Sequence, residues 1–444
     1  MMTTSDPLSR LRLTVSSGLE EIPMVRVCGR VAEVSPTHIR VAGLSSHIRL
    51  GDRVGIHEDA RTTIGEVVRI DASGATIKPF DERVPVGIGA QASRLGALSV
   101  SPDPAWKGRV INAMAAPLDD LGPLPRGSAR MPLDVEPPPA MRRGRVEKPL
   151  KTGVRVIDLF TPICQGQRVG IFAGSGVGKS TTLAMLARCE GFDTVVVSLV
   201  GERGREVREF LEGPLASNRH RSVVVVATSD ESPMMRRLAP QTALSVAEYF
   251  RDRGESVLLI VDSVTRYAHA ARDVALAAGE PAVARGYAPS VFSTLPKLLE
   301  RAGPGIEGTG DITAVFSVLV DGDDHNDPVA DAIRGTLDGH IVLDRSIANE
   351  GRFPAVNVLG SISRLAELAW TPEQRELVRR LKAMIARFED TRDLRLMGGY
   401  HPGADPELDR AVAMTPRIYD ALRQSTDAPA SRDAFAELAQ TLQS

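Results

Sequence analysis

One stretch decides the fold: Ala173-Gly174-Ser175-Gly176-Val177-Gly178-Lys179-Ser180. It follows an apolar run, Arg168–Phe172, and it precedes a run with helical spacing, Thr181–Glu190. Glycines let consecutive backbone N–H groups turn toward phosphate oxygens, and the N-terminus of the following helix adds positive potential. The order of strand, loop and helix is the context that a phosphate-binding loop requires. We therefore predict a site for a nucleoside triphosphate, ATP, at this loop.

Each residue of the loop has an expected part in binding. Lys179 reaches the β and γ phosphates, and the Ser180 hydroxyl is a ligand for Mg²⁺. Ala173 stands where the strict motif has glycine, and its methyl group is tolerated if its φ angle is negative. The residues expected to contact the nucleotide are Gly174, Ser175, Gly176, Val177, Gly178, Lys179, Ser180 and Thr181.

A second apolar run downstream ends in a carboxylate. Val257–Val261 is followed by Asp262, where a strand at the active edge of a sheet presents the residue that holds Mg²⁺ through its water shell. Asp262 can also serve as a cap for the helix that starts at Ser263. We predict that Asp262 lies on the metal side of the site.

A third apolar run, Thr194–Val200, leads into Gly201-Glu202-Arg203-Gly204-Arg205-Glu206. Hydrolysis needs a carboxylate that orients water in line with the γ-phosphate, and Glu202 is our candidate. Arg203 is expected to neutralise phosphate charge. Glu206, one helical turn beyond Glu202, is expected to accept from a water bound to Mg²⁺.

Outward from the loop, the chain reads as an α/β protein with four parts. Residues 99–365 alternate apolar runs with helical patterns, which favours a parallel sheet covered on both faces. Residues 24–98 run in short β-branched segments and predict a β-barrel. Residues 366–444 have helical spacing, with caps expected at Thr371, Asp405 and Ser431. For residues 1–23, disorder and docking to a regulatory partner or to the membrane surface are both open.

Composition limits the class of protein. The chain has 444 residues, more than one core of roughly 250 to 300 residues holds, and a formal net charge of -2, which gives no global attraction to nucleic acid. No apolar run approaches the about 18 residues of a membrane span, so a cytoplasmic location is expected. The cysteines, Cys28, Cys164 and Cys189, lack CxxC spacing and are expected to be buried thiols.

These motifs occur together with Val246-Ala247-Glu248-Tyr249-Phe250-Arg251-Asp252 and Asp321-Gly322-Asp323-Asp324-His325-Asn326-Asp327. In this combination, from about Val25 to Leu422, the chain resembles the flagellar and other type III export ATPases, which are relatives of the F-type and V-type ATPases. The resemblance implies an N-terminal β-barrel, a RecA-like P-loop domain and a helical C-terminal domain. It also implies that Glu202 is the catalytic carboxylate, that Asp262 is the Walker-B aspartate, and that Lys179 and Ser180 bind the nucleotide.

The resemblance implies further site residues and partners. Arg364, in Ser361-Ile362-Ser363-Arg364, occupies the place of an arginine finger that the family donates to the adjacent subunit, and Phe353 that of an aromatic stacked on adenine. The implied assembly is a homohexameric ring with its active sites shared between subunits. The implied partners are export-apparatus regulator and stalk proteins, chaperone–cargo complexes and, peripherally, the inner face of the cytoplasmic membrane.

Alternatives of other kinds stay open at this point. A virulence injectisome ATPase and the β subunit of a rotary ATP synthase share the same motifs. The synthase usually has Thr where Gly204 stands and Gly where Val207 stands, and it has an acidic run where this chain has the mixed stretch Ala386–Leu394. An RNA-tracking ring helicase would need base-stacking aromatics in its N-terminal module, and before Arg94 this chain has only Phe80. We therefore expect ATP hydrolysis for flagellar protein export, without nucleic acid.

Overall fold

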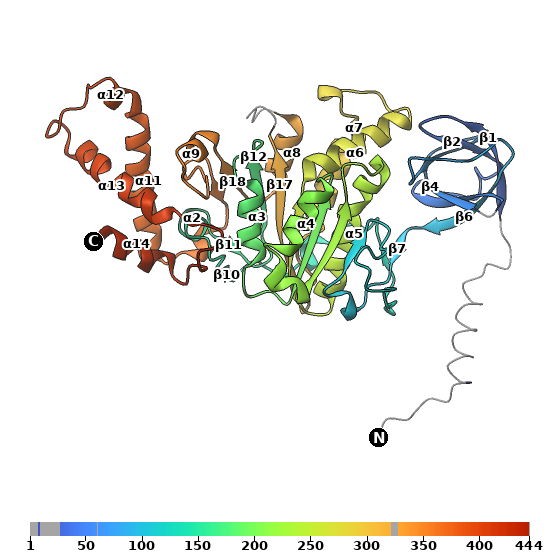
Figure 1. Cartoon of the computed structure of the whole chain (residues 1–444), viewed down its shortest axis with the longest axis horizontal. Coiled ribbons are helices and arrows are strands. Elements are labelled where there is room, and N and C mark those ends of the chain that lie inside the picture. The colour runs from blue at the N-terminus through green and yellow to red at the C-terminus, as the bar shows by residue number, and fades with distance from the viewer. Residues whose placement is uncertain (1–7, 9–26, 60, 321–326, 444) are drawn as a thin grey trace. The chain divides into compact units, whose positions relative to one another are not determined.

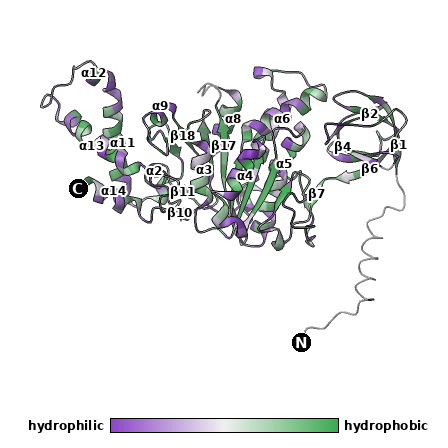
Figure 2. Cartoon of the chain, viewed as in Figure 1, coloured by the Kyte–Doolittle hydropathy of each residue, from purple (hydrophilic) through white to green (hydrophobic). Residues whose placement is uncertain are grey.

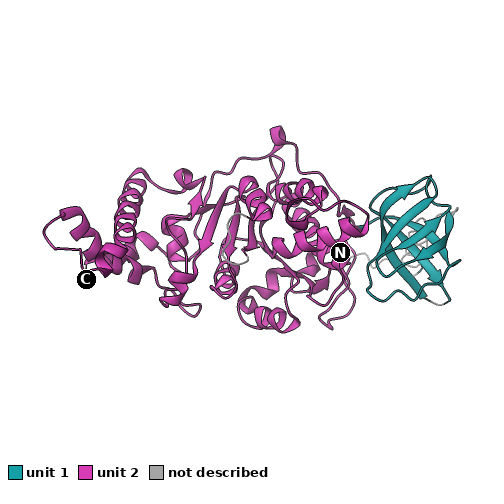
Figure 3. Cartoon of the chain, turned by 90° about the horizontal axis from the view of Figure 1, so that it is seen from above, with its two compact units in different colours: residues 1–98 teal, residues 99–444 magenta. Residues whose placement is uncertain are grey.

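The computed structural model describes residue 8 and residues 27–59, 61–320 and 327–443. The chain divides into two compact units, Met1–Leu98 and Ser99–Ser444 (Figure 3). Most of the predicted docking segment at the N-terminus and of the family segment 321–327 lies outside the described residues. Within the described part of the chain, no helix combines the length and the apolar character that crossing a bilayer needs.

The first unit contains a closed barrel with the strand order β1-β2-β5-β4-β3-β6. Alternate residues point inward along its strands; in β2, for example, Ile39 and Val41 are buried while Arg40 and Ala42 are partly exposed. This period of two is what a strand with one buried face requires. The predicted barrel is confirmed, with β1 Cys28–Val34, β2 Ile39–Ala42, β3 Asp52–Glu58, β4 Arg61–Asp71, β5 Gly74–Pro79 and β6 Gln91–Ala97.

The second unit is built around a sheet of nine described strands in the order β19-β18-β12-β17-β15-β13-β14-β8, with β16 paired to β17. All pairs are parallel except those of β19 and β16. Their bounds are β8 Val110–Asn112, β12 Arg168–Ala173, β13 Thr194–Val200, β14 Ser222–Ala227, β15 Ser256–Asp262, β16 Gly303–Pro304, β17 Asp311–Leu319, β18 Gly339–Leu343 and β19 Ile362–Ser363. Two short pairs lie outside this sheet: β7 Ser99–Val100 with β9 Met131–Pro132, and β10 Pro149–Leu150 with β11 Ile163–Cys164.

The strands of this sheet are apolar because both of its faces are covered. Every residue of β13 is buried, and the central strands stand out as hydrophobic in Figure 2. The long helix α5 packs against β13, β14 and β15 (Figure 1). The helices that follow the strands are α2 Arg155–Phe160, α3 Lys179–Ala187, α4 Gly204–Glu212, α5 Pro233–Asp252, α6 Val264–Ala277, α7 Pro289–Glu300, α8 Pro328–Thr336 and α9 Arg345–Asn349. The predicted α/β core is confirmed.

Helices alone follow the sheet: α10 Ala366–Ala369, α11 Pro372–Asp390, α12 Arg392–Leu396, α13 Pro406–Leu422 and α14 Ala434–Gln443. The hydrophobic core of the sheet continues among them through Leu381, Ile385 and Ile418. Thr371 forms a capping box with Gln374, and Asp405 caps α13. The helical C-terminal part is confirmed, whereas the boundary at 365 and 366 stays a prediction.

Strand β8, in the stretch between Ser101 and Pro149, pairs with β14 at the edge of the sheet. Two local expectations are wrong. The cap of α14 is Asp433, whose carboxylate accepts from the backbone N–H groups of Phe435 and Ala436, while Ser431 bonds to Glu437 instead. Cys164 and Cys189 are buried, but Cys28 is exposed on the barrel.

The register of the sheet gathers the three predicted motifs at one edge. Leu199 of β13 pairs with Asp262 of β15, and Val261 pairs with Phe316 of β17. Ala173 of β12 pairs with Leu319 of β17. The carboxyl ends of β12, β13 and β15 therefore meet at the same edge, where open α/β sheets bind their ligands.

Candidate active site

The phosphate loop has the backbone that its glycines predict. Gly176 and Gly178 have φ angles of 76° and 95°, a conformation that costs glycine little, and α3 begins at Lys179. Ala173 ends β12 and is not among the described residues with a positive φ, which satisfies the condition placed on its methyl group. Ser175, Gly176 and Ser180 are exposed, so the loop is open to a ligand.

Lys179 lies between two of the predicted carboxylates. Its ammonium group donates to Asp262 Oδ1 and, at 3.4 Å, to Glu202 Oε1. The side chains are only 12% exposed for Lys179, 17% for Glu202 and 8% for Asp262. The fold thus brings together three residues of which the first, Lys179, and the last, Asp262, are 83 positions apart in the sequence. An ammonium group paired in this way can exchange its carboxylate partners for phosphate oxygens.

Asp262 has a neighbour that sequence reasoning missed. Ser317, fully buried in β17, donates its hydroxyl to Asp262 Oδ1 at 2.7 Å. This bond fixes the carboxylate at the end of β15. The available signal was a lone hydroxyl in the otherwise apolar end of the run from Ala314 to Leu319.

Glu202 has an unusual acidity. Burial raises the pKa of Glu202 to about 7, and the negative charge of Asp262 and a hydrogen bond with Glu206 act in the same direction against the attraction of Lys179. The pKa of Glu206 is lowered, chiefly because it accepts that hydrogen bond from Glu202. A carboxyl group that titrates near neutral pH is suited to proton transfer and to orienting water.

Two arginines lie beside this group. Arg203 is paired with Glu206 at 3.4 Å, and its side chain is 75% exposed, so it lies at the rim of the cluster. Arg266, on α6, was not predicted. The carbons of its side chain lie against Gly201, and its buried Nε has no hydrogen-bond partner among the described residues.

Phe353 lies next to the phosphate loop although the two are far apart in sequence. A Cβ atom placed on Gly178 would meet Cδ1 and Cε1 of Phe353 at 3.4 Å. The residue is 38% exposed, which leaves part of it accessible to a ligand. The position suits the predicted stacking on adenine, which stays a prediction.

Arg364 is not part of the site in its own subunit. It directly follows β19, which pairs with Gly339 and His340 at the start of β18. The phosphate loop follows the opposite end of the neighbouring strand, where Ala173 is level with Leu343. Arg364 is exposed, and its backbone N–H donates to Asp338 O at 2.9 Å. Any contact of this side chain with a nucleotide would involve another subunit.

The donor set fits Mg²⁺. The Ser180 hydroxyl at the first turn of α3 and the Asp262 carboxylate provide hard oxygen ligands, which Mg²⁺ prefers, and phosphate oxygens of a nucleotide would complete the shell.

Comparison with known proteins identifies the family of this chain. Residues 153–363 match the family model of the ATP synthase alpha/beta family, nucleotide-binding domain, and residues 370–442 match that of the T3SS EscN ATPase C-terminal domain. The chain is 59% identical over 414 residues to the flagellum-specific ATP synthase of Agrobacterium fabrum, which covers 93% of this chain and 88% of that protein.

Solved structures share the fold of this chain. The assembled ATPase EscN from the type III secretion system of enteropathogenic E. coli superposes with a TM-score of 0.87 at 40% identity, covering 93% of this chain and all of EscN (100%). EscN in complex with its central stalk EscO superposes with a TM-score of 0.85 at 39% identity, covering 93% of this chain and 100% of EscN. With its carboxylates and lysine gathered at the phosphate loop, the chain belongs to the family of flagellum-specific ATP synthases and type III secretion ATPases, which are ATP-hydrolysing enzymes.

Proposed function

We propose that this chain hydrolyses Mg·ATP as a homohexameric ring that energises the export of flagellar proteins, by unfolding substrates or releasing them from chaperones at the export gate. The observation that carries the hydrolysis is the cluster of Lys179, Glu202 and Asp262 at the phosphate loop. The flagellar assignment is supported by the 59% identity to a flagellum-specific relative, against 46% to the SPI-2 type 3 secretion system ATPase of Salmonella typhimurium. The C-terminal match to the EscN model supports an export ATPase over a rotary synthase subunit.

The residues of the site suggest how hydrolysis proceeds. The backbone N–H groups from Gly174 to Thr181 bind the phosphates, and Lys179 moves from its carboxylate partners to the β and γ phosphates. This exchange frees Glu202 to orient and polarise the attacking water. Ser180 and Asp262 would hold Mg²⁺, with Glu206 accepting from one of its waters; the ion neutralises phosphate charge when bound. Arg203 would add positive charge at the rim.

The partners follow the family. EscN has been solved in complex with its central stalk, and we propose a comparable stalk protein for this ring, together with an export regulator and chaperone–cargo complexes. We propose a cytoplasmic location with peripheral contact at the inner face of the membrane. Arg364 of one subunit would complete the site of the next, and Phe353 would stack on the adenine.

Two variants separate binding from hydrolysis. Lys179→Ala removes the ammonium group that grips the phosphates, so nucleotide binding and turnover should both be lost. Glu202→Gln keeps the shape of the side chain but not the base, so binding should persist while turnover falls by at least about 100-fold. Calorimetry and a phosphate-release assay measure the two effects. Unchanged turnover in either variant would refute the proposed site.

The role in export is tested in a cell. A strain without the gene should fail to assemble flagella, and it should recover motility with the wild-type chain but not with Glu202→Gln. Intact motility together with lost injection of effectors would point to the virulence apparatus instead.

A further inference from the structure

The loop of residues 350–353, called the 350–353 loop below, connects the nucleotide site to the C-terminal helices. It follows α9, and its last residue is Phe353, whose ring lies beside Gly178 of the phosphate loop. The side chains of Glu350 and Arg352 and the carbonyl group of Phe353 are each contacted by a residue from the C-terminal part of the chain. The loop therefore touches the candidate active site on one side and α12 and α13 on the other.

Arg352 packs against the aromatic ring of Tyr419. Its side chain is 10% exposed, and its guanidinium carbon lies 3.5 Å from the centroid of the Tyr419 ring on α13. The same guanidinium donates to Glu350 at 3.3 Å. The Tyr419 hydroxyl in turn donates to Glu389 of α11 at 2.6 Å. A cation held over a desolvated aromatic face is attracted more strongly than an exposed one.

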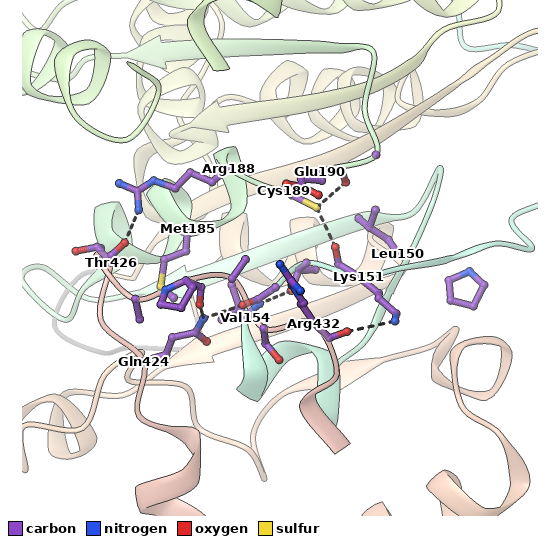
Figure 4. Close-up of a pocket in the computed structure, with 18 of the residues that line it drawn as sticks. Leu150, Lys151, Val154, Met185, Arg188, Cys189, Glu190, Gln424, Thr426 and Arg432 are labelled. Carbon is purple, nitrogen blue, oxygen red and sulfur yellow. Dashed lines mark hydrogen bonds between the residues drawn. The ribbon is translucent and has the colours of Figure 1, made fainter. Parts of the chain in front are cut away.

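Two other contacts fix the ends of the 350–353 loop. Arg392 of α12 donates to Glu350 at 3.1 Å. The backbone N–H of Gln424, just beyond α13, donates to the carbonyl of Phe353 at 2.9 Å. The buried side chain of Gln424 donates to Gly153 O at 2.8 Å and accepts from the N–H of Arg155 at 3.0 Å, in the wall of a cavity of about 740 Å³ (Figure 4).

Open space flanks these contacts. Two further cavities of about 280 and 420 Å³ share five lining residues, namely Glu350, Arg352, Glu389, Arg392 and Tyr419. A loop bordered by cavities is not confined by close packing on those sides, so its position depends on a few directional contacts.

We propose that Arg352 is a positioning residue: held over the Tyr419 ring, it sets the place of the next residue, Phe353, against the base of the bound nucleotide. The C-terminal helices thereby control how well the site recognises the base, while the phosphate loop is left unchanged. This inference rests on the proposed nucleotide site. By thermodynamic reciprocity, a partner that binds these helices and moves Tyr419 changes ATP affinity, and ATP changes the affinity for that partner by the same factor.

The test compares two probes that share the phosphates but not the base. Calorimetry on the full chain with Mg²⁺ gives the dissociation constants of a non-hydrolysable ATP analogue and of inorganic tripolyphosphate. Arg352→Met and Tyr419→Leu each remove the cation–π contact, so each should weaken binding of the analogue by about 3- to 20-fold. The double variant should bind the analogue no more weakly than either single variant. Tripolyphosphate should bind all of these proteins as it binds the wild type.

Two further variants test whether the loss of affinity is specific to the contact between Arg352 and Tyr419. Arg352→Lys keeps a cation near the ring and should restore most of the affinity. Arg395 lies 3.6 Å from the Phe388 centroid in the same kind of contact, within α11 and α12, so Arg395→Met should leave both affinities unchanged.

The outcomes separate this inference from the function on which it rests. Equal weakening of both probes in Arg352→Met, or weakening of neither, would overturn the positioning role while the phosphate site stands. If the wild-type chain binds the ATP analogue and tripolyphosphate with equal affinity per site, Phe353 does not contact the base. The positioning role of Arg352 would then be overturned as well. Tripolyphosphate binding that survives Lys179→Ala would instead refute the proposed nucleotide site.

Discussion

At the scale of single residues, the site depends on how its carboxylates are held and protonated. Asp262 is fixed by Lys179 on one side and by Ser317 on the other, and Glu202 lies mostly buried beside them. A group that only orients Asp262, the carboxylate that we propose for Mg²⁺, still matters, because the residues behind metal ligands commonly affect activity by about 10- to 100-fold.

Ser317→Ala removes the hydroxyl that donates to Asp262, so we expect ATP turnover to fall by about 10-fold or more. The binding of ATP should also depend less strongly on the Mg²⁺ concentration. The matched control is Ser198→Ala on the nearby strand β13, whose buried hydroxyl has no hydrogen-bond partner among the described residues. Its removal should leave turnover unchanged. Steady-state kinetics at varied Mg²⁺ make the comparison, and equal behaviour of the two variants would contradict the role of Ser317.

The acidity of Glu202 predicts a pH profile. Burial first, and then the charge of Asp262, raise the pKa of Glu202 to about 7, so below that pH the group is mostly protonated and cannot polarise water. We expect kcat/KM, which reports the free enzyme, to rise as the pH increases through about 7 and then to level off. Mg²⁺ is kept saturating throughout. Nucleotide binding by Glu202→Gln should stay flat across the same range, and a flat kcat/KM in the wild type would argue against this group.

At the scale of elements, one buried ion pair ties α5 to the end of α7. Arg301 donates to both carboxylate oxygens of Glu248, at 2.9 and 2.8 Å, and also to Leu133 O and Ser245. Both side chains are about 5% exposed or less. Breaking such a pair leaves a buried charge without its partner, which is costly even though the intact pair contributes little net stability.

Glu248→Gln should therefore lower the free energy of unfolding by about 3 kcal/mol, because the Arg301 charge stays buried. Urea denaturation followed by circular dichroism measures the change. Glu212→Gln breaks the exposed pair with Arg208 on α4 and is the control, with an expected change within about 0.5 kcal/mol. Equal shifts in the two variants would mean that the pair at Glu248 is solvated in solution.

At the scale of the whole molecule, the site is split between copies of the chain if Arg364 acts as proposed. Arg364 lies at the end of the sheet opposite to its own phosphate loop, so one subunit cannot supply both. Specific activity should then rise with protein concentration as rings assemble.

Mixing two inactive variants tests this sharing. Arg364→Ala should bind ATP but turn it over about 1,000-fold or more slowly, and Lys179→Ala should not bind it. In mixed rings, an intact phosphate loop meets an intact Arg364 from its neighbour, so activity should return. A mixture of Lys179→Ala and Glu202→Gln has no intact site in any pairing and should stay inactive. Activity that fails to return in the first mixture would place Arg364 outside the neighbouring site.

The sequence by itself determined the features that depend on near neighbours. The phosphate loop, the apolar strands that lead to Glu202 and Asp262, and the Thr371 capping box all arise within a few residues, where side-chain type and spacing set the backbone. The prediction of an α/β core between a barrel and helices follows from the same local periodicities.

Only the tertiary structure decided which distant residues meet. Ser317 reaches Asp262 across 55 positions because β15 and β17 pair in one particular register. Strand β8 forms by pairing with β14 at the edge of the sheet. Phe353 reaches Gly178 because helices far along the chain hold the 350–353 loop in place. Such contacts depend on register and packing between whole elements, which no short window of sequence encodes.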